Sequence, residues 1–299
     1  MSYIPAAGLP SQLNVNFRSS FESAQGANDG QFALNTGGDP VNLDFDSFLL
    51  KLVVGYAELD IMGYVQLFGS FAFEAGPSET VTLTGGSKKT LKTLTIGFND
   101  VNAFVGNGPY FVDTTGDGRV DENDSPNSNA MGLVIEDLDG GFMLLASTEA
   151  TDPGAYFALK SSLTYAGIVG IDAITLEVAN VAFEMNLGLG TSGTVVVDFK
   201  QSFGEDGYAV STGNPDEPVY LDFENMWVRI AGEVHIVVAD VLYFLGYADL
   251  QMDEEGILIF ADMELSIGDE PISRGAAPWI NFHARGLLVV EYAGDIGLN

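Results

Sequence analysis

Cysteine and histidine are the residues this chain lacks or nearly lacks. Its 299 residues include no cysteine, which excludes a disulfide framework, a thiolate metal site and a cysteine nucleophile. Only two histidines occur, and the motifs Gly-x-Ser-x-Gly and His-Glu-x-x-His are absent. His235 follows the outer side of a predicted strand and His283 lies near a predicted edge, which favours structural or solvent-facing roles. The sequence therefore predicts no enzyme.

Basic residues are also scarce. The chain has 11 Lys and Arg residues and 42 Asp and Glu residues, which gives a formal net charge of −31. Such a chain repels phosphate backbones and anionic lipids, so neither nucleic-acid binding nor membrane insertion is expected. No apolar run is long enough for a membrane-spanning helix. The start, Met1–Pro5, has neither the basic nor the apolar region of a secretory signal, so we expect another export route or a piece of a longer protein.

Helical periodicity is missing, whereas alternation with period two runs through the chain. From Val53 to Phe73 every second residue is apolar or glycine, and the segment Val228–Met252 alternates in the same way. Alternation predicts strands with one face buried. The sequence thus favours an all-β fold, an elongated wrapped or solenoid-like, mainly antiparallel sheet that bends at Gly55, Gly63 and Gly69. Two stacked β-sandwiches are the alternative.

Two pairs of segments indicate an internal repeat. Leu13–Phe17 matches Val195–Phe199 at a spacing of 182 residues, and Asp39–Phe45 matches Glu217–Phe223 at a spacing of 178. We therefore predict three parts. They are a lead-in at 1–12, a first β-repeat unit at 13–193, and a partial second copy at 194–299.

The residues Asp113–Asp124 have the spacing of a calcium-binding loop. An EF-hand-type loop of twelve residues supplies oxygen ligands from positions 1, 3, 5, 7, 9 and 12 and needs glycine at position 6. Gly118 occupies position 6, and Val120 at position 8 is expected to pack inward. The predicted ligands of Ca²⁺ are Asp113, Thr115, Asp117, the carbonyl of Arg119, Asp121 and Asp124.

Two ligand positions depart from the usual pattern. Thr115 is a neutral ligand, and Asp124 replaces the usual glutamate, as in dockerin loops. The alternative reading is an acidic turn that binds nothing. Further acidic pairs, Asp44 with Asp46, Asp137 with Asp139 and Glu149 with Asp152, are either secondary calcium sites or solvated charge that discourages edge-to-edge aggregation, and the second is favoured.

Several segments resemble the large β-rich tandem repeats of giant bacterial cell-surface, adhesin-like proteins, with a single dockerin/EF-hand-type calcium loop. They are Ala103–Gly106, Pro109–Tyr110, the calcium loop, Ala130 with Gly132–Leu133, Ala158–Lys160, and Val169–Asp172. The resemblance implies a passive, extended, calcium-stiffened segment and no enzyme. Pro126 follows the single loop and leaves no room for a helix, so cohesin recognition is not implied.

The expected function is therefore that of a calcium-binding structural repeat in an extracellular or cell-surface protein, giving reach, stiffness, adhesion or assembly. Cysteine-free, acidic composition and 36 glycines fit that location, where calcium is millimolar. Expected partners are calcium, neighbouring repeats and copies of the chain itself. One alternative is a polysaccharide- or protein-binding module that uses Trp227 and Trp279, although Trp227 fits a core position better. Another is a self-assembling extracellular filament subunit.

Overall fold

The computed structural model describes residues 16–21, 31–35, 37–38, 40–43, 45, 48–121, 123–149, 151–189 and 193–292. The chain is mostly antiparallel β-sheet, with 61% strand and 5% helix, so the predicted all-β class is confirmed. The predicted lead-in at 1–12 lies outside the described residues, as do residues 190–192 beside the predicted unit boundary. The boundaries of the repeat units thus stay a prediction.

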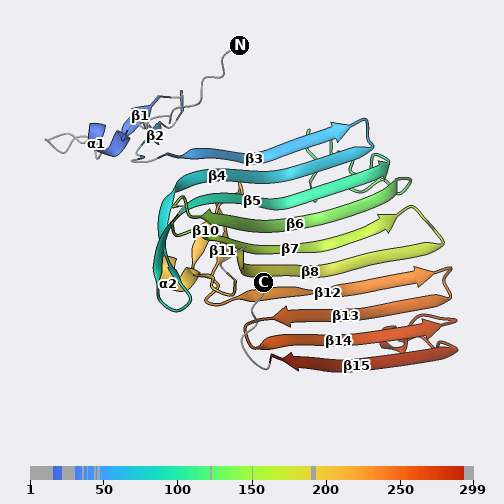
Figure 1. Ribbon diagram of the computed structural model, residues 1–299. Helices are drawn as coiled ribbons and strands as arrows, with labels where there is room; N and C mark the ends of the chain where they lie inside the picture. Colours follow the sequence, from blue (N-terminus) through green and yellow to red (C-terminus); the bar gives the residue numbers. More distant parts are fainter. Residues whose placement is uncertain are drawn as a thin grey trace, which may run out of the picture.

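One sheet of 11 strands organises the described residues (Figure 1). Along it the strands follow the order β15-β14-β13-β12-β8-β7-β6-β5-β4-β3, and the short strand β9 pairs with β4. All neighbours are antiparallel, so the sheet is a meander with one interruption between β8 and β12, in place of two stacked sandwiches. The long strands are β3 (Leu50–Ile61), β4 (Val65–Leu83), β5 (Lys88–Asn107), β6 (Met131–Ala146), β7 (Ala155–Val169), β8 (Ile174–Leu189), β12 (Trp227–Val238), β13 (Leu242–Met252), β14 (Gly256–Ile267) and β15 (Ile280–Glu291).

The three glycines at which bends were expected all mark irregularities of the first hairpin. Gly63 lies in the turn between β3 and β4 with φ +72, where a left-handed conformation favours glycine. Gly55 lies in the register shift between Val54 and Ala57. Gly69 has φ +148, and a Cβ there would lie 2.8 Å from the carbonyl oxygen of Asp100. The alternating pattern therefore continues through turns and bulges.

Between β8 and β12 the chain leaves the sheet and folds back onto one of its faces. This segment, residues 195–226, is called the cap. It contains β9 (Val197–Asp198), α2 (Phe199–Phe203), β10 (Tyr208–Val210) and β11 (Val219–Leu221). The carboxylate of Asp198 accepts a hydrogen bond from the amide of Gln201 at 2.8 Å and so caps α2. The strands β10 and β11 pair as a hairpin.

The main hydrophobic core lies between the cap and the sheet. Phe199, Val210 and Leu221 of the cap are fully buried. They belong to one cluster with side chains from β4 to β7, namely Val81, Leu83, Leu91, Met143, Leu145, Tyr156 and Ala158. Cap elements thus pack against four neighbouring strands, β4 to β7.

The N-terminal elements repeat the cap. They are α1 (Phe17–Phe21), β1 (Phe32–Leu34) and β2 (Val41–Leu43), with β1 and β2 paired, and are called the N-terminal module. The amide of Phe17 donates to the carbonyl of Phe45 at 2.8 Å, as the amide of Phe199 donates to that of Phe223 at 2.7 Å. The segments that match in sequence therefore share one local structure, yet Figure 1 shows the module beside the start of β3 and apart from the cap.

Candidate calcium loop and acidic cleft

The predicted calcium loop lies between β5 and β6, at one end of the sheet. Two side chains hold it against the strands: Val120 is buried, and Tyr110 stacks on the buried ring of Phe104 with centroids 5.6 Å apart. The side-chain oxygen of Gln66 on β4 accepts hydrogen bonds from the amides of Tyr110 and Phe111, at 2.9 and 3.0 Å. The loop is thus fastened at its base to β4 and β5.

Within the loop, the first and last predicted ligands organise the backbone. One carboxylate oxygen of Asp113 accepts from the amide of Gly116 and the other from the amide of Gly118. Asp124 accepts from the amides of Thr114 and Thr115, at 2.7 and 2.9 Å. The amide of Thr115 is the main reason why the pKa of Asp124 falls to about 2. Both carboxylates are therefore turned toward the same short stretch of loop backbone.

The remaining predicted ligands make local contacts. The hydroxyl of Thr115 lies 3.4 Å from a carboxylate oxygen of Asp113. Asp117 accepts from the amide of Arg119, and Asp121 from the amide of Asn123. The guanidinium of Arg119 lies 5.0 Å from the centre of the Tyr56 ring. Among the described residues, no three carboxylates or histidines come together as a metal centre, so calcium binding stays a proposal.

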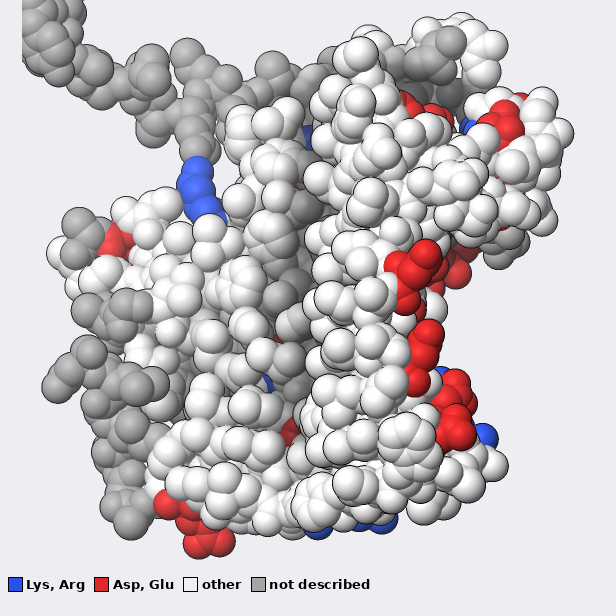
Figure 2. Space-filling view, turned by 90° about the vertical axis from the view of Figure 1, so that its right-hand side faces the viewer, with Lys and Arg blue, Asp and Glu red and all other residues white. Residues whose placement is uncertain are grey.

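An acidic cleft of 1020 Å³ separates the loop from the cap. Its carboxylates come from three places: the loop, the strands β5 and β6, and the hairpin β10–β11. They are Asp100, Asp121, Asp124, Glu136, Asp137, Asp139 and Glu217. The residues that line it include no Lys, Arg or His. Acidic side chains gather in a row along the right-hand side of Figure 2, the side view of the molecule.

A row of β-bulges builds the floor of this cleft. Asp100 on β5 and Asp137 on β6 have φ of +50 and +55, and the pairing of β5 with β6 shifts register on either side of Val101. A bulge inserts one extra residue and re-aims a side chain. The two aspartates at the bulges, Asp100 and Asp137, therefore line the cleft. After each bulge the strand returns to its alternating pattern.

Asparagines hold the central carboxylates in place. Asn99 donates its side-chain amide to Asp139 at 2.8 Å and to Glu217 at 3.0 Å, and Asn214 also donates to Glu217. Burial raises the pKa of Asp139, and the charges of Asp137 and Glu217 raise it further, against hydrogen bonds that lower it. A cleft of oxygen ligands without cationic side chains attracts divalent cations and repels oxyanions.

The sequence predicts some of the carboxylates that line the cleft but not others. It singled out Asp137 with Asp139 as a possible second calcium site, but not Asp100 or Glu217. The available signal was the interruption of alternation at Asn99-Asp100 and at Glu136-Asp137, where consecutive polar residues indicate a bulge. Glu217 gives no local signal, because it reaches the cleft only when the cap folds back onto the sheet.

Other candidate residues do not form a second site. His235 lies 3.1 Å from Glu177, and His283 contacts Asp262. Lys89 pairs with Asp152 at 2.7 Å, whereas Asp44 and Asp46 lie outside the described residues. Trp227 is the first residue of β12, and its indole N–H donates to Glu184 on β8.

The two tryptophans lie far apart. Trp279 is exposed just before β15, which runs opposite to β12, so Trp227 and Trp279 lie at opposite ends of the sheet. They cannot form one sugar-stacking platform.

No helix among the described residues has the length and apolar composition to cross a membrane. Comparisons of the chain with family models, with curated proteins and with solved structures find no match.

Proposed function

We propose that the chain is a calcium-stabilised structural repeat segment of an extracellular or cell-surface protein, in which consecutive copies of one unit join into a continuous sheet. The observation that carries the proposal is the joint between the two copies. β12, the first long strand of the second copy, pairs with β8 over eleven residue pairs from Trp227↔Asn186 to Val238↔Ile174. The cap that precedes β12 lies on the sheet of the first copy.

The joint is a buried core rather than a linker. Phe199 and Leu221 of the second copy are fully buried against the first copy, and Asn186 on β8 donates its side-chain amide to the carbonyls of Val197 and Asn225, each at 2.9 Å. A unit joined in this way transmits force through strand pairing and packed side chains. Stiffness and reach follow from this geometry.

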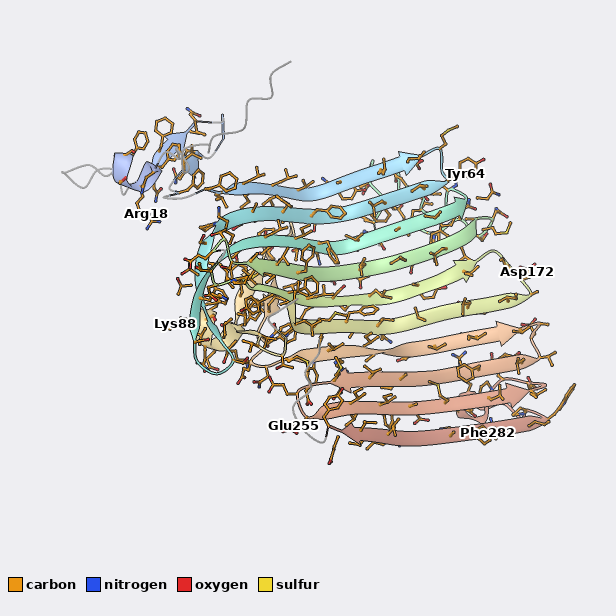
Figure 3. The ribbon with its side chains drawn as sticks, viewed as in Figure 1. Arg18, Tyr64, Lys88, Asp172, Glu255 and Phe282 are labelled. Atoms are coloured by element: carbon orange, nitrogen blue, oxygen red, sulfur yellow. The ribbon has the colours of Figure 1, made fainter. Side chains whose placement is uncertain are left out.

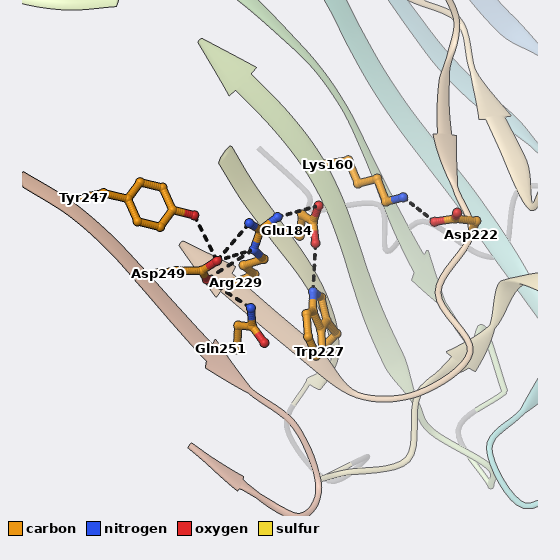
Figure 4. A network of polar contacts seen from close by, with 8 residues as sticks. All are labelled: Lys160, Glu184, Asp222, Trp227, Arg229, Tyr247, Asp249 and Gln251. Atoms are coloured by element: carbon orange, nitrogen blue, oxygen red, sulfur yellow. Dashed lines mark hydrogen bonds and ion pairs between the residues drawn. The ribbon is translucent and has the colours of Figure 1, made fainter. Parts of the chain in front are cut away.

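Polar contacts reinforce the joint on the face that carries the cap (Figure 4). Arg229 on β12 pairs with Asp249 on β13 at 2.9 Å and with Glu184 on β8 at 3.7 Å. The ammonium of Lys160 on β7 pairs with Asp222 of the cap. Burial raises the pKa of Asp249, but hydrogen bonds from Arg229, Gln251 and Tyr247 outweigh it and lower that pKa. Both copies contribute to this network.

The proposed calcium site is the loop Asp113–Asp124, where a bound ion would stabilise the folded chain. A cation that binds the folded loop and not the unfolded chain adds RT ln(1 + [L]/Kd) to the free energy of unfolding. Because the loop rests on Phe104, Tyr110 and Gln66, an ordered loop also fixes one end of the first unit. Asp113, Thr115, Asp117, the carbonyl of Arg119, Asp121 and Asp124 would hold the ion.

Calorimetric titration of calcium into chelator-treated protein tests the metal site. We expect binding by the wild type and its loss in the double variant Asp113→Ala/Asp117→Ala. The control Glu254→Ala/Glu255→Ala removes two carboxylates from an exposed turn between β13 and β14 and should bind like the wild type. No heat in the wild type, or unchanged heat in the loop variant, would refute the calcium site.

Unfolding tests the joint. Trp279→Phe leaves Trp227 as the one tryptophan, at the start of β12. Its fluorescence and the far-ultraviolet circular dichroism should then follow one coincident denaturant transition, because the two copies share a sheet and a core. Two separate transitions would show that the copies fold independently and are not joined as proposed.

A filament subunit is a second candidate, favoured by the two outer strands. β3 and β15 are each paired on one side only in the described sheet, and both expose apolar side chains such as Leu52 and Leu288. Unpaired edges can pair with another chain. In the proposed filament, one chain would extend the sheet of the next as β12 extends it from β8 within this chain.

A further inference from the structure

One face of the sheet carries almost only apolar side chains. It is the face opposite the cap and the calcium loop, and is called the open face. On β12 to β15 it is a grid of six residues on each of four strands, fixed by the register of the pairs. The grid consists of Val228, Ile230, Gly232, Val234, Ile236 and Val238; Leu242, Phe244, Gly246, Ala248, Leu250 and Met252; Ile257, Ile259, Ala261, Met263, Leu265 and Ile267; and Ile280, Phe282, Ala284, Gly286, Leu288 and Val290.

The charged residues of these four strands all alternate to the other face. They are Arg229, Glu233, His235, Asp249, Asp262, Glu264, His283, Arg285 and Glu291. The open face continues over the first unit with pairs such as Leu163↔Val181 and Phe183↔Ile230. On this face Phe142 and Phe157 lie 5.9 Å apart between ring centres. The uncharged surface therefore extends across the joint and over both copies.

Nothing among the described residues covers the open face. Phe282 on the outer strand β15 (Figure 3) is 62% exposed, Leu288 is 56% exposed and Leu242 is 38% exposed. Monomeric soluble proteins rarely expose a continuous apolar patch larger than about 300–600 Å². This face departs from the expectation that the alternating apolar side is buried, and an exposed apolar area of this size marks an interaction site.

We propose that the partner is a second copy of this chain, packed with its open face against the open face of the first. Size is the first reason. Four strands about 4.8 Å apart and about 12 residues long span roughly 750 Å². A standard interface needs about 800 Å² from each partner, and the strands of the first unit add to that area.

Shape is the second reason. Gly232, Ala248, Ala261 and Gly286 lie in register and form a row of small residues across the four strands. Beside it runs a row of large residues, Ile230, Leu250, Ile259 and Leu288. Stacked sheets interdigitate side chains at a spacing of about 10 Å. A face with both a groove and a ridge can fit a rotated copy of itself, as a two-fold interface requires.

Charge is the third reason. In a face-to-face pair the acidic residues of each copy point outward, away from the interface, so the net charge of −31 is not brought into it. An anionic lipid surface would instead meet the long-range repulsion of the whole chain. The proposal is independent of the joint between copies within one chain, whose test is the unfolding experiment above.

The first test measures molecular mass by sedimentation equilibrium over a range of concentrations. The wild type should be a dimer. Leu250→Lys places a charge on the open face and should raise the dissociation constant at least about tenfold, which corresponds to about 1.4 kcal/mol. The matched control Gln251→Lys adds the same charge one residue away on the other face of β13 and should leave the dimer intact. A monomeric wild type, or equal effects of both variants, would overturn the proposal.

A second measurement does not depend on how Leu250→Lys folds. Because the chain has no cysteine, Met252→Cys places one spin label at the rim of the open face, and Gln251→Cys places one on the opposite face. The distance between labels in the two copies should be shorter from position 252 than from position 251. The reverse order, or no interaction between labels, would contradict face-to-face packing. Flotation of a monomer with phosphatidylcholine vesicles would assign the face to lipid instead and also refute the dimer.

Discussion

The cap and the N-terminal module have matching sequence motifs and similar internal contacts, but among the described residues only the cap is packed on a sheet. In the module the rings of Phe17 and Phe45 lie 5.6 Å apart, and in the cap those of Phe199 and Phe223 lie 6.3 Å apart. Yet Phe32 is 40% exposed. Local sequence is therefore enough to form this aromatic cluster, whereas its burial depends on strands supplied by another part of the chain.

The cap and the N-terminal module should differ most in how much stability is lost when the central phenylalanine of each is removed. Phe199→Ala removes a fully buried ring from the core between cap and sheet, so the free energy of unfolding should fall by about 3–5 kcal/mol. Phe17→Ala removes the equivalent ring from a site without a sheet beneath it and should cost less than about 1 kcal/mol. Urea denaturation of the full chain measures both. Equal losses would mean that the module is packed as tightly as the cap.

A pair of glycines sharpens the comparison further. Gly213 in the cap and Gly37 in the module both have positive φ, at +95 and +86. A Cβ at Gly213 would lie 2.5 Å from the amide nitrogen of Phe71 and the carbonyl oxygen of Val54, whereas a Cβ at Gly37 would meet nothing within 4 Å.

Alanine at either glycine carries the cost of the left-handed conformation, about 1–2 kcal/mol. Only Gly213→Ala adds a backbone clash with β3 and β4. We expect Gly213→Ala to lower the free energy of unfolding by at least about 1 kcal/mol more than Gly37→Ala, measured by urea denaturation. If Gly37→Ala proved as costly, the module would lie against backbone in solution.

Asn186 tests what the first copy contributes to the joint. Its side chain is fully buried and donates to two carbonyls in the segment that leads to β12. Asn186→Leu keeps the size but leaves those carbonyls without a partner, which should cost about 1–3 kcal/mol. The variant should also separate the fluorescence transition of Trp227 from the loss of circular dichroism. A loss of stability with coincident transitions would mean that Asn186 supports the first copy alone.

Part of this structure follows from the sequence, because alternation and repetition are local signals. The pattern from Val53 to Phe73 predicts paired strands, and the match of Leu13–Phe17 with Val195–Phe199 predicts related segments. Burial is not local. The core beneath Phe199 comes from Val81, Leu91 and other residues more than 50 positions earlier, so the sequence cannot show which copy of the motif is covered.

The assembly of the acidic cleft does not follow from the sequence for the same reason, although some of its carboxylates do. Glu217 and Asn99 are 118 residues apart in the sequence and meet only through the fold of the cap. The exposure of the open face does not follow from the sequence for a different reason. Alternation distinguishes an apolar side from a polar one, but it does not show whether the apolar side is covered within the same chain. At Leu242 and Phe282 that side is exposed.

The smallest expected effect concerns the cleft, where the cap and the first unit contribute carboxylates to one another. Burial raises the pKa of Asp139 above its unfolded value, with repulsion from Asp137 and Glu217 adding to the shift. For an acid with a raised folded-state pKa, the unfolded chain ionises first as the pH rises. Stability is therefore lost between the unfolded pKa and the folded pKa, and the loss is complete above the latter.

Asp139→Asn should remove that loss while its side-chain oxygen still accepts from Asn99 and from the amide of Asp100. In chelator at pH 7 the variant should melt about 1–3 °C above the wild type. The gain should shrink as the pH falls from the folded pKa toward the unfolded pKa of about 3.9, and it should vanish below that pH, where Asp139 is protonated in both states. Asp216→Asn, on the same hairpin as Glu217 but outside the cleft lining, is the control and should change little. A lower melting temperature for Asp139→Asn at pH 7 would mean that the ionised carboxylate stabilises the contact between the first unit and the cap, because its hydrogen bonds then outweigh its burial.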